Sequence, residues 1–518
     1  MKIFEIASEH ADRPAVIMTG SKEQLSYGEM LERACRLAAY FREAGLRRGD
    51  CIAIMLENNP RYFEVYWAAM ISGFFCTPVN SHLSADETTY IVNDCGAKGI
   101  VTSIFLAEVV ENMQEEIPNC NIRLMMDGVA SGFSSYENAL ANSSPEPPEN
   151  PHGGSLLLYS SGTTGRPKGI YRPLPVPGNK PATSNMLSPF GIGSDTVYLS
   201  PGPLYHAAPL GFATGAQLVG STVLVMEKFD PEEALRAIEM YQVSHSQWVP
   251  TMFSRMLKLP KEVREKYNMS CHKMAIHGAA PCPPEVKRSL IDWWGPILLE
   301  YYSGSEGNGM TLINSRDWLS HPGSVGRAMM GIVHICDDDG NELPTGEDGL
   351  IYFEQKRRIS TYLNDDKKTA DSAHPKHSTW TALGDVGHVD EEGFVYLTDR
   401  KTELIISGGV NIYPAETENW LITHDKIVDV AVIGVPDEEF GESVMAIVQL
   451  ASGVTAGPDL VEELIAFSKL KLASFKCPRT IDFTDELPRL PTGKLYSTSG
   501  CCGISIGVNE NLSWFSRF

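Results

Sequence analysis

Positive charge is scarce in this sequence of 518 residues. Lys and Arg number 43 against 65 Asp and Glu, which leaves a formal net charge of −22. A chain with this balance repels polyanions, which argues against a general binder of nucleic acid or of an anionic membrane surface. An anionic substrate would have to meet positive groups gathered at one place.

Paired cysteines are also missing. The 11 cysteines are scattered singly apart from Cys501 and Cys502, and no Cys-x-x-Cys pair occurs. This usage argues against a disulfide framework and a zinc site, and it is typical of reduced thiols in a cytoplasmic protein. The first residues, MKIFEIASEHADRP, carry acids early and hold no long apolar run. We therefore expect no signal peptide.

Long uncharged runs are absent with one exception. The stretch 206–226 has no charged side chain over a membrane-like length, but it contains Pro209, Gly211, Gly215 and Gly220. We expect a buried helix and strand here and no integral membrane span.

Strand-length apolar runs alternate with helical patterns through most of the chain. Hydrophobic residues make up 43% and charged residues 21%, which is ordinary for a globular enzyme. Ser26 and Glu29 form a capping box before apolar residues at helical spacing. Apolar runs at 51–56 and 74–79 flank a helical pattern over 60–72. This alternation predicts an α/β fold with parallel sheets and helices on their faces.

The residue composition and the expected secondary structure change at three places. The stretch 142–151, NSSPEPPENP, is predicted to be a surface linker before a second run of the same alternation. Short strands and turns are expected over 340–400. From Lys401 on, the pattern predicts a compact α+β unit with helices at 415–423 and 459–472.

The densest local signal is YSSGTTGRPKG at 159–169, directly after an apolar run. Small hydroxyl residues and glycines let backbone N–H groups and hydroxyls converge on one anion, and Arg166 and Lys168 add charge. It is not a Walker loop, because Pro167 precedes the lysine. No Gly-x-Gly-x-x-Gly follows an N-terminal strand, which argues against a dehydrogenase. A plain turn is the alternative, but the composition favours a phosphate loop.

The same loop resembles the signature of the adenylate-forming enzymes, which include acyl-CoA synthetases, aryl-CoA ligases, luciferases and peptide-synthetase adenylation domains. Further segments resemble the motifs of this family, in its order, between residues 1 and 496. They are PLYHAAP (203–209), HGAAP (277–281), YSGSE (302–306), LGD (383–385), DRK (399–401), IISGGVNIYPAE (405–416) and LPTGK (490–494). The sequence around these motifs is most similar to fatty-acyl- and aryl-acyl-CoA synthetases.

The resemblance implies an α/β architecture in two parts. An N-terminal region at 1–399 would contain two doubly wound αβ subdomains and a small β-barrel-like subdomain. A small, mobile α+β domain at 400–496 would carry the catalytic lysine. Residues 497–518 form an atypical tail that is poor in charge.

The resemblance also implies a reaction in two halves. A carboxylic acid attacks the α-phosphate of ATP to give an acyl-adenylate and pyrophosphate, and coenzyme A then displaces AMP. ATP, Mg²⁺ and coenzyme A are thereby implied, with a carboxylic acid as substrate and a monomer or homodimer as the assembly.

Three residues are implied to be catalytic. Lys494 would bridge the carboxylate and the α-phosphate, Glu306 would hold Mg²⁺, and Thr163 would belong to the loop that fixes the phosphates. The residues implied to bind the nucleotide or cofactor form a larger set. They are Ser160, Ser161, Gly162, Thr164, Gly165, Lys168, Gly278, Ala279, Ala280, Tyr302, Ser303, Ser305, Asp385, Arg400, Gly408 and Gly409.

Some of these residues have definite expected roles. Asp385 would accept hydrogen bonds from the ribose hydroxyls, Arg400 would donate to the ribose or phosphate edge, and Tyr302 would offer a face to the adenine ring. Each also has a plainer interpretation. Asp385 alone would be a turn residue, and Glu306 alone would be a solvated acid.

The acyl pocket is assigned by family position to His206, Ala207, Trp248, Gly304 and Met310. Bulky and small residues together favour an apolar fatty or aryl group, and no aspartate stands ready for the amine of an amino acid. Chain length and aromatic character stay open. A lone histidine such as His206 is more often a satisfied core residue.

A further histidine pair, His374 and His377, has ligand spacing but no acids nearby, and is predicted to lie at the surface. Two departures from the family pattern bear on activity. Thr402 is β-branched at the expected hinge, which predicts a slower domain rotation. The tail replaces a basic stretch that usually follows the lysine, which predicts weaker anchoring of the catalytic loop.

Two alternatives therefore remain open beside an acyl-CoA synthetase. One is an acyl-AMP ligase or a luciferase-like enzyme that does not use coenzyme A. The other is a catalytically impaired nucleotide-binding relative, in which the altered tail has abolished turnover.

Overall fold

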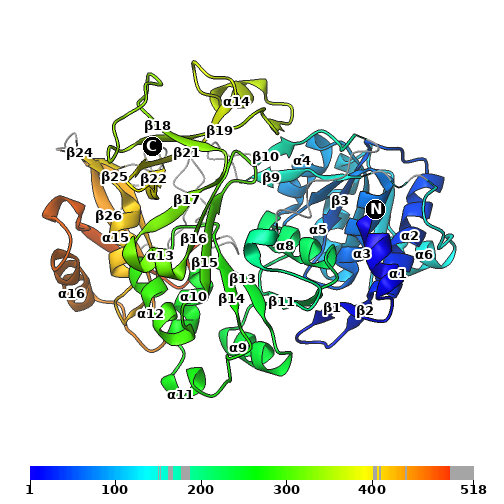
Figure 1. The fold of residues 1–518 in the computed structure, drawn as a ribbon, viewed down its shortest axis with the longest axis horizontal. Coiled ribbons are helices and arrows are strands. Elements are labelled where there is room, and N and C mark those ends of the chain that lie inside the picture. Colours follow the sequence, from blue (N-terminus) through cyan, green and yellow to red (C-terminus); the bar gives the residue numbers. More distant parts are fainter. Residues whose placement is uncertain are drawn as a thin grey trace.

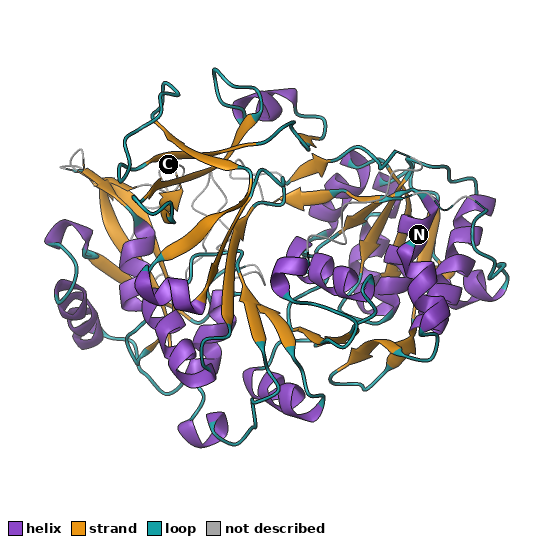
Figure 2. Ribbon diagram, in the orientation of Figure 1, coloured by secondary structure: helices purple, strands orange, loops and turns teal. Residues whose placement is uncertain are grey.

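The computed structural model describes most of the chain. The described residues are 1–149, 151, 153–160, 167–176, 187–400, 405–407, 410–437 and 440–489. At 399, 400, 406, 410, 411 and 441 the backbone alone is described. The N-terminal part lies on the right and the C-terminal part on the left of Figures 1 and 2.

The first sheet has six parallel strands in the order β7-β6-β5-β3-β4-β8. Its strands are β3 (Cys51–Met55), β4 (Phe75–Pro78), β5 (Ala97–Ser103), β6 (Ile122–Met126), β7 (Ser134–Ser135) and β8 (Ser155–Leu156). The helices in the N-terminal part of the chain are α1 (Lys2–Glu9), α2 (Tyr27–Glu43), α3 (Arg61–Ser72), α4 (Ala85–Asp94), α5 (Ala107–Asn112) and α6 (Tyr136–Ala141), with 3-10 turns at Ile104–Leu106 and Gln114–Glu116. The predicted strands at 51–56 and 74–79 and the helix at 60–72 are all confirmed.

The largest sheet has 13 strands in the order β18-β19-β21-β22-β17-β16-β15-β14-β13-β11-β12-β1-β2. From β1 to β15 the neighbouring strands are parallel. The strands of this part are β1 (Pro14–Met18), β2 (Gln24–Ser26), β11 (Val197–Ser200), β12 (Thr222–Val225), β13 (His245–Trp248), β14 (Met274–His277) and β15 (Leu298–Ser303). Its helices are α8 (Ala207–Gln217), α9 (Pro231–Met240), α10 (Pro250–Leu257), α11 (Lys261–Arg264), α12 (Pro284–Trp294) and α13 (Ser315–Ser320), with a 3-10 turn at Ser188–Phe190.

Beyond β15 the same sheet continues as an antiparallel, hairpin-rich region. Its strands are β16 (Met310–Asn314), β17 (Ser324–Met330), β18 (Ile332–Cys336), β19 (Gly349–Glu354), β21 (Trp380–Val389) and β22 (Val395–Arg400). A separate three-stranded sheet, β20-β10-β9, comprises β9 (Leu158–Ser160), β10 (Lys168–Tyr171) and β20 (Thr361–Tyr362), followed by α14 (Asp366–Asp371). The short strands and turns expected over 340–400 are confirmed.

The C-terminal part is built on a five-stranded sheet, seen in yellow and orange in Figure 1. It comprises β23 (Ile405–Ser407), β24 (Val410–Ile412), β25 (Ile427–Asp437), β26 (Gly441–Leu450) and β27 (Thr480–Thr484), with α15 (Pro414–Leu421), α16 (Pro458–Lys469) and a 3-10 turn at Ser474–Lys476. The predicted α+β character is confirmed. The division at residue 400 stays a prediction.

Two lysines join the C-terminal part to the large sheet's helices. Lys258, just after α10, donates from Nζ to the carbonyls of Ile427 and Val428, the latter at 3.2 Å. Lys471 approaches the carboxylate of Glu285 to 3.9 Å. Burial lowers the pKa of Lys258 to about 8. The contact therefore combines backbone acceptors with a partly desolvated ammonium.

Local sequence signals explain where these elements begin. The Glu29 amide donates to Ser26 Oγ at 3.2 Å and the Ser26 amide donates to the Glu29 carboxylate at 2.9 Å, which confirms the predicted capping box. The uncharged stretch 206–226 forms α8 and β12, both largely buried, as expected. Over the part of the chain described, no helix is both long and apolar enough to cross a bilayer.

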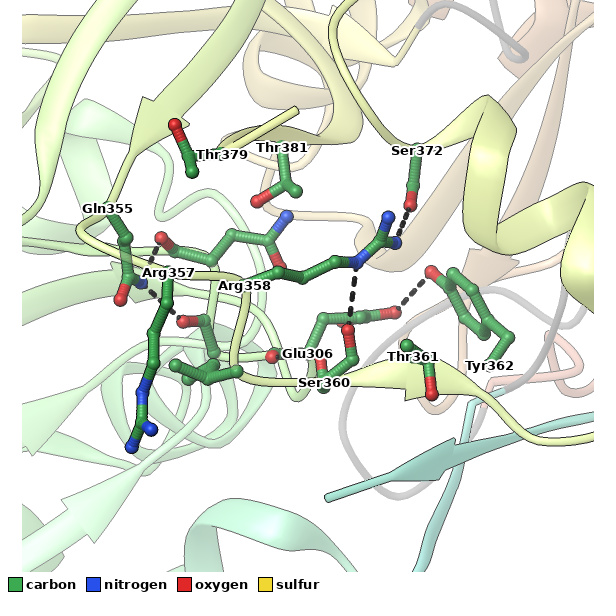
Figure 3. Close-up of a pocket in the computed structure, with 13 residues that line it drawn as sticks. Glu306, Gln355, Arg357, Arg358, Ser360, Thr361, Tyr362, Ser372, Thr379 and Thr381 are labelled. Carbon is green, nitrogen blue, oxygen red and sulfur yellow. Dashed lines mark hydrogen bonds between the residues drawn. The ribbon is translucent and has the colours of Figure 1, made fainter. Parts of the chain in front are cut away.

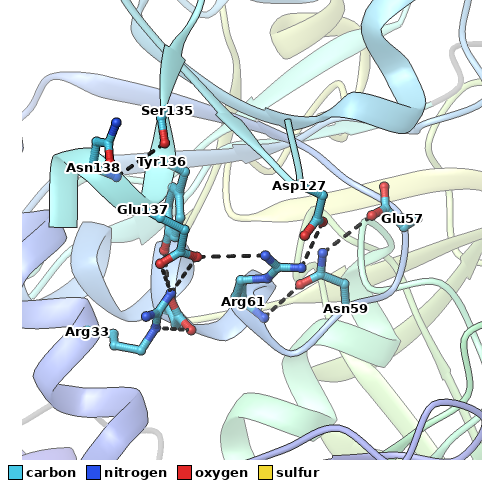
Figure 4. A network of polar contacts seen from close by, with 10 residues as sticks. Arg33, Glu57, Asn59, Arg61, Asp127, Ser135, Tyr136, Glu137 and Asn138 are labelled. Atoms are coloured by element: carbon cyan, nitrogen blue, oxygen red, sulfur yellow. Dashed lines mark hydrogen bonds and ion pairs between the residues drawn. The ribbon is translucent and has the colours of Figure 1, made fainter. Parts of the chain in front are cut away.

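A buried carboxylate ties three helices of the N-terminal part together, and its partners Arg33 and Tyr136 are labelled in Figure 4. Glu64 on α3 is 0% exposed; it accepts from Arg33 on α2 at 2.7 Å and from the Tyr136 phenol on α6, also at 2.7 Å. Arg33 also contacts Glu137 at 2.9 Å. Two donors offset the desolvation of the Glu64 charge, so the network specifies how these helices pack.

The histidine pair near the hairpins is not wholly at the surface. His377 is exposed, but His374 is 4% exposed and packs edge-on against Trp380. The prediction of a surface position is therefore wrong for His374, because its ring packs against Tyr352 as well as Trp380. Within the described ranges, no group of three or more His, Cys, Asp or Glu residues is arranged to hold a metal ion.

Candidate active site

Two of the family-like motifs leave the large sheet at the same edge. HGAAP begins at the last residue of β14, and YSGSE begins in the last two residues of β15. Because β14 and β15 are parallel neighbours, the two following loops lie side by side at their carboxyl ends. This edge is where ligands bind in open α/β sheets.

The first loop has a tight and strained backbone. A side chain at Gly278 would place its Cβ 2.7 Å from both the ring and the carbonyl oxygen of Tyr301. Ala279 has a φ of +73°, a left-handed conformation that costs a non-glycine residue about 1 kcal/mol or more. Strain of this kind is concentrated at binding and catalytic sites. Ala280 follows in the same loop.

A buried ion pair links helix α12 to strand β15. Lys287 on α12 lies 2.5 Å from Glu300 on β15, and the two side chains are 0% and 5% exposed. Burial raises the pKa of Glu300 and lowers that of the adjacent His277, whose Nε2 is 4.0 Å from Glu300. Sequence reasoning missed this pair. Its one sequence signal is the charge of Glu300 inside the apolar run PILLEYY.

Tyr302 and Asp385, which were both assigned to the nucleotide, lie together. The Tyr302 phenol donates to Asp385 Oδ2 at 2.6 Å, and Asp385 is 7% exposed. Asp385 on β21 pairs with Arg400 on β22, so the backbone brings the predicted ribose-binding residues to one place. The side chain of Arg400 lies outside the described residues.

Glu306 occupies the turn after β15, beside a pocket shown in Figure 3. Its Oε1 accepts a hydrogen bond from the Tyr362 phenol at 2.9 Å. Burial first, and then the Glu306 charge, raises the pKa of Tyr362, so the phenol stays a donor at physiological pH. Ser303 donates to the Gly309 carbonyl at 2.8 Å, and the Ser305 carbonyl accepts from Arg172 at 2.5 Å.

A carboxylate with one oxygen already bound to a neutral donor suits Mg²⁺. This ion is usually held by one or two carboxylates together with substrate phosphates, so a site with a single carboxylate needs the nucleotide to complete it. The single carboxylate of Glu306 fits that pattern, and it stands beside the strand pair that carries the phosphate loop.

The two ends of the phosphate loop are held by β9 and β10. Ser160 pairs with Lys168 in this antiparallel pair. Lys168 forms an ion pair with Asp365 at 2.7 Å, and this contact raises the pKa of Lys168. Lys168 was predicted to bind phosphate. In the structure its ammonium contacts the carboxylate of Asp365, which lies after β20, and the predicted role stays a prediction.

The predicted acyl-pocket residues are only partly grouped. His206 and Ala207 open α8, and Gly304 and Met310 lie near each other, because Met310 pairs with Ser303. Burial, with His82 nearby, lowers the pKa of His206 to about 3, so the ring is neutral. Its Nε2 has no hydrogen-bond partner among the residues described.

Trp248 does not fit the predicted pocket. It is 0% exposed, its Nε1 donates to Ser246 Oγ at 2.5 Å, and its indole packs against Phe253 and Trp294. It belongs to the hydrophobic core under α10 and α12. The bulky ring was assigned to the pocket by family position, but in the structure it packs against rings from α10 and α12.

Several predicted residues lie outside the described part of the chain. They are Ser161, Gly162, Thr163, Thr164, Gly165, Gly408, Gly409 and Lys494. Their roles stay predictions.

Comparison with known proteins identifies the family of the chain. The family model described as AMP-binding enzyme matches residues 3–363, and the model described as AMP-binding enzyme C-terminal domain matches residues 416–494. A feruloyl-CoA synthase from an Amycolatopsis species is 33% identical over 91% of this chain and 92% of its own length. The long-chain-fatty-acid–CoA ligase FadD13 of Mycobacterium tuberculosis is 29% identical over 93% of this chain and 94% of its own.

The fold is shared with solved structures. The anthranilate CoA ligase AuaEII, in complex with anthranoyl-AMP, superposes with a TM-score of 0.82 at 19% identity, covering 96% of this chain and 95% of that one. The predicted α/β fold, with a large N-terminal region and a small C-terminal domain, is thereby confirmed. The chain belongs to the AMP-binding, adenylate-forming enzymes, and it is an AMP-forming acid–thiol ligase.

Proposed function

We propose that the chain is an ATP-dependent acyl-CoA synthetase for an apolar aryl or fatty carboxylic acid. The observation that carries the proposal is the convergence of the Tyr302–Asp385 pair and Glu306 at the carboxyl end of β15, next to the strands that frame the phosphate loop. The names of the two relatives, a feruloyl-CoA synthase and a long-chain-fatty-acid–CoA ligase, support this substrate class.

The first half-reaction brings two anions together. A carboxylate oxygen of the acid attacks the α-phosphorus of ATP, and the bond to the β-phosphate oxygen breaks, so that pyrophosphate leaves. Two unit charges about 4 Å apart repel by about 4 kcal/mol at an effective dielectric of 20. Positive groups at fixed positions are therefore needed. Lys494 would supply one, and bound Mg²⁺ would lower the charge of the phosphates.

Each described residue then has a task that its contacts suit. Asp385, held by the Tyr302 phenol, would orient the ribose. The Gly278 loop, whose glycine packs directly on Tyr301, would lie along the adenine, as the family resemblance implies. Glu306 would place Mg²⁺ on the phosphates. Positioning of this kind supplies most of the rate in phosphoryl transfer.

The second half-reaction needs a thiol. The thiol of coenzyme A loses its proton, its sulfur bonds to the acyl carbon, and the bond from that carbon to the AMP oxygen breaks. A neutral His206 at the start of α8 would line the acyl pocket without adding charge, which suits an apolar acyl group.

The test is pyrophosphate release from ATP and Mg²⁺ with a panel of acids, with and without coenzyme A. The panel runs from short and long fatty acids to cinnamic-type and polycyclic acids. We expect pyrophosphate release with one class of acid. AMP and the thioester should form in equal amounts, and only when coenzyme A is present. Release with no acid of the panel would overturn the proposed substrate class, and thioester-free turnover would favour a ligase that does not use coenzyme A.

A further inference from the structure

The turn that carries Glu306 is held by side chains from outside its own strand. Within the turn, the Gly307 amide donates to the Gly304 carbonyl at 2.9 Å. The next carbonyls accept from elsewhere: Ser305 from Arg172 at 2.5 Å, and Glu306 from the Ser360 hydroxyl at 2.6 Å.

Gln355 completes this set of contacts. Its side-chain amide donates to the Gly307 carbonyl at 2.7 Å and also to the carbonyl of Asn308 (Figure 3). Four consecutive carbonyls, from Ser305 to Asn308, are therefore bound by three side chains. Buried carbonyls need such partners, and partners from several segments leave the turn one conformation.

The carboxylate of Glu306 has two oxygens in different surroundings. Oε1 accepts from the Tyr362 phenol. Oε2 lies on the side of Gly304, where an added Cβ would stand 2.9 Å from it and 2.4 Å from Leu383 Cδ2. Leu383 is two residues before Asp385. The phenol thus turns Oε2 toward the strand that carries the predicted ribose-binding residue.

Most of the residues that hold this turn lie in or next to the sheet β20-β10-β9, whereas Gln355 directly follows β19 of the large sheet. Tyr362 on β20 pairs with Ile170 on β10, and Arg172 directly follows β10. β10 in turn pairs with β9, and the phosphate loop joins these two strands. This three-stranded sheet therefore connects Tyr362 and Arg172 to the two strands that flank the phosphate loop in the sequence.

We propose that Tyr362 is a positioning residue for adenylation, which fixes Glu306 through Oε1 so that Oε2 is the oxygen offered to the Mg²⁺ of Mg·ATP. This rests on the proposed function. Tyr362 touches neither substrate nor metal in this arrangement.

The experiment compares Tyr362→Phe with Tyr396→Phe. Tyr396 on β22 is the matched control. Its phenol also donates to a carboxylate, that of Asp390 at 3.3 Å, and this contact does not involve Glu306. ATP binding is measured by calorimetry without any acid substrate, once with Mg²⁺ and once with EDTA. Removal of a hydrogen bond to a charged group is expected to change the affinity for ATP on the order of 10-fold.

We expect Tyr362→Phe to weaken ATP binding about 10-fold with Mg²⁺ and less than about 2-fold with EDTA, while Tyr396→Phe changes neither. In turnover, the Mg²⁺ concentration for half-maximal pyrophosphate release should rise in Tyr362→Phe alone. In a Glu306→Gln background, Tyr362→Phe should add no further loss, because both changes act on one carboxylate.

Equal losses with Mg²⁺ and EDTA, or no loss at all, would overturn the proposal. If Tyr362→Phe does not fold, Ser360→Ala provides the second variant, since it releases the Glu306 carbonyl, and the same Mg²⁺-dependent loss is expected. The binding measurement does not require turnover. Failure of the wild-type protein to release pyrophosphate would therefore count against the proposed function and leave the result on Tyr362 readable.

Discussion

The buried pair of Lys287 and Glu300 should cost far more to break than a surface pair. The two side chains meet at 2.5 Å and are 0% and 5% exposed. Lys287→Met would leave the Glu300 carboxylate buried without its cation. Removal of one partner of a buried pair destabilises by about 3–5 kcal/mol. Since Glu300 lies on β15 and Lys287 on α12, the loss should appear in those two elements.

Two further variants separate burial from the loss of an ion pair as such. Lys287→Met combined with Glu300→Leu removes both charges, and apolar replacement of a buried pair is often neutral, so most of the stability should return. Lys426→Met breaks an ion pair with Glu463 at 2.7 Å whose side chains are 42% and 43% exposed. It should cost less than about 1 kcal/mol.

Native-state hydrogen exchange is the appropriate assay, because it gives opening free energies for separate segments of a large chain. The amides of α12 and β15 should lose protection in Lys287→Met and regain it in the double variant. A cost below about 1 kcal/mol in Lys287→Met, or a double variant as unstable as the single one, would refute the reasoning.

Three other outcomes are expected. Burial lowers the pKa of His206 to about 3, so as the pH falls the imidazole is protonated in the unfolded chain before it is in the folded one. The fold therefore loses stability between about pH 6.5 and pH 3. An NMR titration midpoint of His206 near 6.5 would contradict this. Asp365→Asn should lower the pKa of Lys168 and free its ammonium for nucleotide, reducing the KM for ATP by less than about 5-fold, and a raised KM would count against it. Arg33→Met should destabilise the N-terminal part by about 3 kcal/mol in urea unfolding, because Glu64 loses its cation, and an unchanged midpoint would contradict the role of that network.

Local signals in the sequence predicted the framework of the fold. The capping box of Ser26 and Glu29, the apolar runs of the parallel strands and the helix and strand of 206–226 all depend on residues close in sequence. Such signals are strong because they are set by backbone geometry and by local hydrogen bonds. The order of the motifs predicted the family.

Contacts between distant segments could not be predicted in the same way. Asp365 meets Lys168, and Tyr362 meets Glu306, only because β20 pairs with β10. Trp248 was assigned to the acyl pocket by family position. Its place in the core could not be predicted, since no local pattern tells which face of a fully buried strand a side chain occupies.

The transfer of labelled oxygen tests the central claim most directly. The carboxylic acid that supports turnover is labelled with ¹⁸O in its carboxyl group, and AMP and pyrophosphate are analysed by mass spectrometry after reaction with coenzyme A. If the carboxylate attacks the α-phosphorus, one ¹⁸O appears in AMP and none in pyrophosphate. Unlabelled AMP, or formation of ADP and phosphate in its place, would contradict an adenylate-forming acid–thiol ligase.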